Sequence, residues 1–221
     1  MNTNSTMKLF IILLSATLLS SLHAQEAPEI TKADVHYTHA SLLFADNKIE
    51  DAMEQCGKAL ELDPDHHKSL NLMGACLVNQ RDFDTARRYF QRVQDVAPNL
   101  SAEFNIAELD FLSKHWKTAK KSFQDLLKQK DLKKNVANLS RFKLMIISLH
   151  LGDQASFDKH EQFFKDNMMR CEFEFSQLLK TVHNKKPKKE DAMRAMRHLS
   201  QMHGNAAIYI DSILEAYYIE D

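Results

Sequence analysis

Residues 33–66 read ADVHYTHASLLFADNKIEDAMEQCGKALELDPDH, and residues 67–100 read HKSLNLMGACLVNQRDFDTARRYFQRVQDVAPNL. The two segments repeat one pattern of small, apolar and Pro residues with a constant spacing. The pairs, each 34 residues apart, are Ala40/Gly74, Leu43/Leu77, Ile49/Phe83, Ala52/Ala86, Cys56/Phe90, Ala59/Val93 and Pro64/Pro98. A period of this length is typical of a solenoid, in which a helical hairpin buries its apolar face only against its neighbours.

The two copies resemble the tetratricopeptide repeat, a helix–turn–helix unit of 34 residues. The family has a small residue at its eighth position, Ala at its twentieth, an aromatic residue near its twenty-fourth and Pro at its thirty-second. The matching residues are Ala40, Ala52 and Pro64 in the first copy, and Gly74, Ala86, Phe90 and Pro98 in the second. The first copy departs from the family at Cys56, where an aromatic residue is usual, and at His36 and His39, where large apolar residues are usual.

A third copy, residues 100–134, follows with its register slipped by one residue. Its marks lie 33 residues after their counterparts: Ala107, Trp116, Ala119, Phe123 and Leu126. Residues 135–221 match the repeat pattern at only a few positions, and we expect degenerate hairpins and a closing helix there. The expected helices are 33–45, 49–62, 67–79, 83–96, 141–151, 155–164, 171–182, 190–202 and 205–218, with a basic loop at 183–189.

The resemblance therefore predicts an all-α fold, a right-handed α-solenoid of stacked hairpins with a C-terminal capping helix. The division is 33–66, 67–99 and 100–134 for the three clear repeats, then 135–221 for the degenerate hairpins and the cap. The composition agrees, because 4 Gly and 4 Pro leave little material for turn-rich β architecture. A net charge of -1 gives no bulk attraction to nucleic acid or to an anionic membrane.

The N-terminus predicts a signal peptide over residues 1–24 and a short lead-in over 25–32. Lys8 precedes an uncharged run from Leu9 to Leu22, which is short for a bilayer span, and Ala24 offers a small residue for cleavage. We therefore expect a periplasmic or secreted protein without stable membrane insertion after cleavage. An uncleaved anchor is the alternative.

An exported chain meets an oxidising compartment, where thiols tend to pair. In the repeat register, Cys56 lies on the second helix of the first copy and Cys76 on the first helix of the next, which packs against it. A Cys56–Cys76 disulfide is one prediction, and Cys171 is then left over. The alternative, which we favour, is three buried thiols that act as small apolar side chains.

No catalytic motif is recognised: there is no Gly-rich phosphate loop, no nucleophile elbow and no His-Glu-x-x-His pair. We expect no enzyme, no cofactor and no metal. His36 and His39 share a helical face, and His66 and His67 lie at the next junction. Such pairs could serve a metal-dependent hydrolase if further ligands were fixed beside them. Packing histidines are the better interpretation.

In the resembled family, the first helix of each hairpin lines a concave groove through its second, fifth, ninth, twelfth and thirteenth positions. The matching positions are Asp34, Tyr37, Ser41, Phe44, Ala45, Lys68, Asn71, Ala75, Val78, Asn79, Ser101, Phe104, Glu108, Phe111 and Leu112. From these we predict a partner-binding site made of Tyr37, Ser41, Phe44, Lys68, Asn71, Asn79, Phe104, Glu108 and Phe111.

This groove is aromatic and apolar with a few amides, a composition that suits a protein or peptide partner. Tyr37 and Ser41 stand where chaperone-binding members need Lys and Asn to clamp a carboxylate, so a chaperone-tail adaptor is disfavoured. The expected function is a non-catalytic protein–protein interaction scaffold in the cell envelope. Self-association and a purely structural stack are the alternatives for the same surface.

Overall fold

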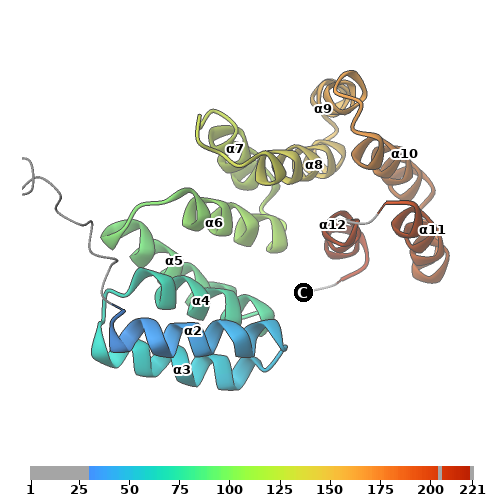
Figure 1. The fold of residues 1–221 in the computed structure, drawn as a ribbon. Coiled ribbons are helices and arrows are strands. Elements are labelled where there is room, and N and C mark those ends of the chain that lie inside the picture. Colours follow the sequence, from blue (N-terminus) through green and yellow to red (C-terminus); the bar gives the residue numbers. More distant parts are fainter. Residues whose placement is uncertain (1–29, 204–205, 220–221) are drawn as a thin grey trace, which may run out of the picture.

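The computed structural model describes residues 30–203 and 206–219, so the predicted signal peptide and its cleavage site lie outside the described residues, as does most of the lead-in. Within these ranges the chain forms α-helices and no strand, and the expected all-α helical-repeat solenoid is confirmed (Figure 1). The helices are α2 Lys32–Ala45, α3 Ile49–Leu62, α4 His67–Asn79, α5 Phe83–Val96, α6 Leu100–Leu112, α7 Trp116–Leu126, α8 Lys134–His150, α9 Gln154–Asp166, α10 Arg170–Lys185, α11 Lys189–Met202 and α12 Ala207–Tyr217.

The first helix begins at a capping box. The backbone N–H of Asp34 donates to Thr31 Oγ1 at 3.0 Å, and the N–H of Thr31 donates to Asp34 Oδ2 at 3.3 Å. These two bonds satisfy donors that the start of a helix leaves without a partner. The helix therefore starts at Lys32, one residue before the predicted boundary.

Successive helices pair as hairpins, and the small residues of the repeat lie where the helices approach closely. Ala40, Ala52, Ala86, Ala107 and Ala119 are each 0 % exposed. In the first four hairpins the turn between the helices has three residues, and its middle residue is left-handed. These residues are Asn47 (φ 59°), Arg81 (φ 61°), Lys114 (φ 55°) and Gly152 (φ 69°).

The worn second half differs most from its prediction at the start of α8 and at the end of α10. Helix α8 begins at Lys134, seven residues before the predicted start at Arg141. The apolar pattern did not indicate this first part of the helix, because its buried residues include the polar Asn138 and Ser140. Both side chains form hydrogen bonds within the protein. Helix α10 continues to Lys185, so the predicted basic loop is shorter, and Lys186 ends the helix with a φ of 44°.

The closing helix α12 does not simply cover the end of the stack. It packs against α6, α8 and α10, and in Figure 1 it lies on the inner side of the curve that these helices describe. Its ring of Tyr209 meets Phe142 of α8 at 4.8 Å and Phe175 of α10 at 5.8 Å between centroids. The closing helix therefore also fills part of the inner face, which the sequence did not predict. Among the described helices, none has both the length and the apolar character needed to cross a membrane.

Candidate functional site

A ladder of side-chain hydrogen bonds joins the inner helices α2, α4, α6, α8, α10 and α12. Each bond links residues 34 or 35 positions apart, because one repeat places equivalent turns of successive inner helices side by side. The rungs are Asp34–Lys68 (3.0 Å), Asn71–Asn105 (2.9 Å), Glu108–Lys143 (2.8 Å), Asn138–Glu172 (3.3 Å) and His183–Tyr217 (3.0 Å). By this measure α12 continues the row of inner helices as its last member.

The inner face of the first three repeats contains a hollow of about 270 Å³. We call it the inner hollow, and its lining residues come from α2, α4, α5 and α6: Phe44, Ala75, Val78, Asn79, Phe90, Asn105 and Glu108. Phe44, Val78 and Phe90 give it apolar walls, and the two Asn residues bring amide groups. The structure therefore brings three predicted site residues together here, namely Phe44, Asn79 and Glu108.

The carboxylate of Glu108 is compensated within the protein. Lys143 Nζ of α8 donates to Glu108 Oε1 at 2.8 Å and lies 4.0 Å from the centroid of the Phe111 ring. The Lys143 side chain is only 4 % exposed. The inner hollow consequently presents little net charge, and it suits an apolar group with hydrogen-bonding capacity better than an ion.

The predicted residue Tyr37 lies toward the opposite end of α2 from Phe44, and the predicted residue Lys68 of α4 lies beside it. Lys68 Nζ donates to Asp34 Oδ1 at 3.0 Å and lies 5.8 Å from the Tyr37 ring centroid. The buried His66 contacts the same carboxylate oxygen at 3.3 Å. Hydrogen bonds from Thr31 first, and then from Lys68, hold the pKa of Asp34 well below its usual range. The polar groups at this end of the inner face are thus paired with one another.

Two further predicted residues use part of their hydrogen-bonding capacity within the protein. Ser41 donates to the carbonyl of Thr38 in its own helix at 2.8 Å. Asn71 accepts from Asn105 Nδ2 at 2.9 Å, so its amide supports the rim of the inner hollow.

The aromatic residues predicted on α6 are corrected by the structure. Phe111 is 1 % exposed, because Lys143 and Trp116 pack over it. Phe104 packs edge-on against Phe123 at 5.8 Å between centroids, and it lines a separate cavity of about 370 Å³ with Leu132. Neither ring lines the inner hollow. Asn105, which lies 34 residues after Asn71, lines it instead, and the sequence reasoning missed this residue because it applied a spacing of 33.

The histidine pairs do not assemble into a metal site. His36 Nδ1 lies 2.9 Å from Gln55 Oε1 of α3, as expected for a packing residue. His39, which we interpreted as a packing histidine, is instead exposed, and so is His67. In the part of the chain that the structure describes, no three His, Cys, Asp or Glu residues are placed to hold a metal ion.

All three cysteines are free thiols, and the predicted Cys56–Cys76 disulfide is not formed in the structure. Cys56 and Cys76 are each 0 % exposed. Burial raises the pKa of Cys56 to about 12 and that of Cys76 to about 11, so both remain protonated at neutral pH. Cys171 is half-buried, and burial raises its pKa to about 11.

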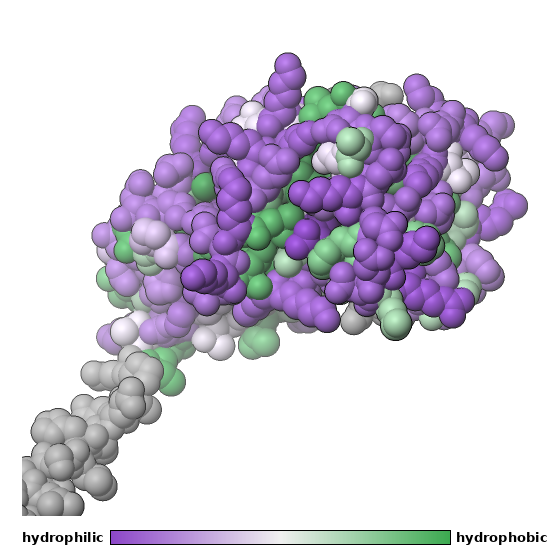
Figure 2. Space-filling model, turned by 90° about the horizontal axis from the view of Figure 1, so that it is seen from above, coloured by the Kyte–Doolittle hydropathy of each residue, from purple (hydrophilic) through white to green (hydrophobic). Residues whose placement is uncertain are grey.

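Most of the face seen from above is hydrophilic, with hydrophobic residues gathered in a strip near its middle (Figure 2). The large apolar side chains that stay exposed include Val35 and Leu42 on α2, at 58 % and 63 %. Their spacing of seven residues places them on one face of the first helix, which has no repeat before it among the described residues.

Residues 43–105 match the family model described as Tetratricopeptide repeat. Among solved structures, a similar one is that of YrrB, described as a TPR protein with an unusual peptide-binding site, with 16 % identity, a TM-score of 0.55, and coverage of 82 % of this chain and 91 % of that one. Another is a tetratricopeptide repeat protein from Parabacteroides merdae, with 14 % identity, a TM-score of 0.59, and coverage of 85 % and 72 %. A third is pilF of Pseudomonas aeruginosa, with 17 % identity, a TM-score of 0.57, and coverage of 83 % and 82 %. No curated protein matches the chain significantly in sequence.

Proposed function

We propose that this chain, whose residues 43–105 match the tetratricopeptide repeat model, is a non-catalytic scaffold that binds a protein or peptide partner in the inner hollow. The observation that carries the proposal is the division of the inner face. Over α8 and α10 the chain's own helix α12 covers this face. Over α2 and α4 the hollow remains, and no described residue of α12 lines it.

The inner hollow suits one large side chain of a partner with the backbone around it. Its volume of about 270 Å³ is just below the range of ligand cavities, roughly 300–1,000 Å³, so it holds one side chain and not a whole small molecule. Phe44 and Val78 supply apolar contact, and such an anchor in a dry pocket carries much of the energy of an interface. The amides of Asn79 and Asn105 flank the hollow and can bond to a peptide backbone.

The location of this binding belongs to the same proposal. The uncharged run from Leu9 to Leu22 after Lys8 supports export, and the partner is then a protein of the cell envelope or the exterior. Cell fractionation and N-terminal sequencing test this part. A mature chain that begins at Gln25 in the exported fraction is expected, and a cytoplasmic full-length chain contradicts it.

Site-specific photo-crosslinking tests the proposed hollow. A photoreactive amino acid replaces the exposed Asn79 at the hollow in one variant, and the exposed Arg88 on the outer helix α5 in the control. We expect an adduct from position 79 and not from position 88. The adduct should disappear when Ala75→Arg fills the hollow, and the identified partner should then bind the purified wild-type chain but not Ala75→Arg.

Two outcomes contradict the proposal. Equal adducts from both positions place the contact outside the inner hollow. An adduct that consists only of two copies of this chain, formed in the purified protein, favours a self-associating repeat protein. Sedimentation of the purified chain with and without Ala75→Arg separates that case, because only self-association through the hollow makes its dimer sensitive to the substitution.

A further inference from the structure

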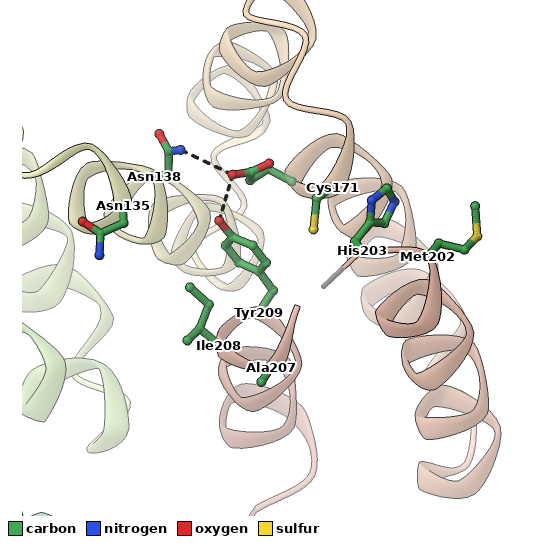
Figure 3. Close-up of a pocket in the computed structure, with 9 residues that line it drawn as sticks. Asn135, Asn138, Cys171, Met202, His203, Ala207, Ile208 and Tyr209 are labelled. Carbon is green, nitrogen blue, oxygen red and sulfur yellow. Dashed lines mark hydrogen bonds between the residues drawn. The ribbon is translucent and has the colours of Figure 1, made fainter. Parts of the chain in front are cut away.

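A larger cavity, of about 860 Å³, lies between the N-terminal turns of α8, α10 and α12 and the C-terminal end of α11 (Figure 3). It shares no described lining residue with the inner hollow. Its polar wall includes Asn138 of α8, Glu172 of α10 and Tyr209 of α12. Met202 and Ile208 add apolar side chains.

Two donors from neighbouring helices hold the carboxylate of Glu172 in place. The hydroxyl of Tyr209 donates to Glu172 Oε1 at 3.0 Å, and Asn138 Nδ2 donates to the same oxygen at 3.3 Å. Tyr209 is 5 % exposed and Asn138 is 9 % exposed, so both donors are fixed by packing. Dashed lines in Figure 3 mark these two hydrogen bonds, one from the labelled Asn138 and one from the labelled Tyr209. The group is therefore preorganised for a further interaction.

The second oxygen of this carboxylate has no hydrogen bond from any described residue, and no described cation pairs with Glu172. Other partly buried carboxylates nearby are compensated. Glu174 accepts from Arg170 Nε at 2.7 Å and lies 2.8 Å from His203 Nε2, and Glu161 accepts from Lys180 at 2.6 Å. The second oxygen of Glu172 is not buried, so a cation that enters the cavity can reach it and form the charge-assisted hydrogen bond that Glu172 lacks.

The other titratable groups at this cavity supply no positive charge opposite Glu172. His203 is engaged by Glu174. Burial, and then the neighbouring carboxylates Glu172 and Glu174, raise the pKa of Cys171 to about 11, so its thiol is neutral.

The apolar residues of this cavity indicate what accompanies the charge. Met202 is 50 % exposed and Ile208 is 43 % exposed, although both are large hydrophobic side chains. Both line the cavity together with Glu172. A ligand with a cationic end and an apolar stem would meet the carboxylate with one part and cover these side chains with the other.

We propose that this cavity binds an ammonium or guanidinium group carried on an apolar stem, with Glu172 as the counter-ion. Two sources share this chemistry, a Lys or Arg side chain of a bound peptide and a free alkylamine. The site is separate from the inner hollow, so the proposal does not depend on the function proposed above. The competing account is that Glu172 only ties three helices together.

Methionine methyl NMR on the full chain tests the proposal. The signal of Met202 at the cavity is assigned by its loss in Met202→Leu. Three probes with one stem length are titrated: n-hexylamine, n-hexanol and hexanoate. The peptides acetyl-Ala-Lys-Ala-amide and acetyl-Ala-norleucine-Ala-amide form a second pair that differs only in the ammonium group.

We expect saturable shifts at Met202 with hexylamine, the Lys peptide or both, and affinities for the uncharged partners roughly tenfold weaker or more, as a charge-assisted hydrogen bond implies. Tighter binding of the amine identifies a free amine as the source, and tighter binding of the peptide identifies a side chain. Glu172→Gln should abolish the preference for charge, whereas the exposed Glu61→Gln should retain it.

The proposal is overturned if none of the cationic probes shifts Met202, or if hexanol binds as well as hexylamine. It is also overturned if Glu172→Gln, still folded by its thermal transition, keeps the preference for charge. The comparison of probes on the unaltered chain needs no variant of Glu172, so it decides the question even if Glu172→Gln does not fold.

Discussion

Lys143 of α8 donates from its ammonium to Glu108 of α6 at 2.8 Å, and both groups sit inside the solenoid, with side-chain exposures of 4 % and 24 %. The same ammonium lies above the ring of Phe111. This pair connects the clear repeats to the worn ones, and it sets the charge at the edge of the inner hollow. One rung of the ladder therefore serves both stability and the proposed binding surface.

We expect Lys143→Met to lower the free energy of unfolding by about 2–4 kcal/mol, because it leaves the Glu108 carboxylate partly buried and unpaired. Urea denaturation followed by circular dichroism measures the change. The double variant Glu108→Gln/Lys143→Met should recover most of the loss. As a control, Lys58→Met breaks the exposed pair with Glu54 (2.7 Å) and should cost less than about 0.5 kcal/mol. Equal losses for the two single variants would refute the role given to the buried pair.

Two glycines in similar helices should respond in opposite directions to the same substitution. A Cβ at Gly74 would lie 2.5 Å from Phe90 Cε1, whereas a Cβ at Gly57 meets nothing within 4 Å. We expect Gly74→Ala to destabilise by about 1–3 kcal/mol through overpacking and Gly57→Ala to stabilise by roughly 0.5–1 kcal/mol.

Thermal unfolding of the two variants beside the wild type checks this. The reason for the loss is tested by Phe90→Leu, which shortens the opposing side chain. That change should reduce the cost of Gly74→Ala, and an undiminished cost in the double variant would contradict the steric account.

The buried histidine His160 should make stability depend on pH in the mildly acidic range. Burial, and then the charge of Arg141, lowers the pKa of His160 from 6.5 to about 4. The unfolded chain takes up the proton first as the pH falls, so this contribution is full above pH 6.5 and is lost between about 6.5 and 4. His150 behaves alike, since burial and then His183 lower its pKa to about 4.

We therefore expect the free energy of unfolding to fall between pH 7 and pH 5, with His160 accounting for on the order of 1 kcal/mol after allowance for solvent screening. Urea midpoints at the two pH values measure the fall. His160→Leu should reduce it, and the exposed His67→Asn should leave it unchanged. An unreduced fall in His160→Leu would show that other groups cause the acid sensitivity.

The turn between α9 and α10 contains a strained residue. Met168 has a φ of 55° and is 92 % exposed, so it adopts a left-handed conformation without gaining any packing. We expect Met168→Gly to stabilise the chain by about 1 kcal/mol, because glycine adopts this conformation freely. Calorimetry measures the change, and Gly152→Ala (φ 69°) should show the reverse sign. A loss of stability in Met168→Gly would contradict the strain.

Local signals decided the first two repeats. The predicted bounds of α3, α4 and α5 agree with the structure to the residue, since apolar periodicity and the breakers around Pro64 and Pro98 act within a few residues. The inner hollow was predicted in part. Phe44, Asn79 and Glu108 line it, but Phe111 is covered by Lys143. The position of Lys143 depends on how the fourth hairpin stacks on the third, and the sequence of that hairpin matches the repeat pattern too poorly to be aligned.

The sequence by itself determined that the chain is a stack of helical hairpins, because a 34-residue period of small and apolar residues can bury its surface in few other ways. Only the tertiary structure decided where α12 lies and which carboxylates are compensated. The pairs Glu108–Lys143 and Asn138–Glu172 depend on how one repeat is placed against the next. That placement is the sum of many weak packing contacts spread along the chain, and no short pattern of residues encodes it.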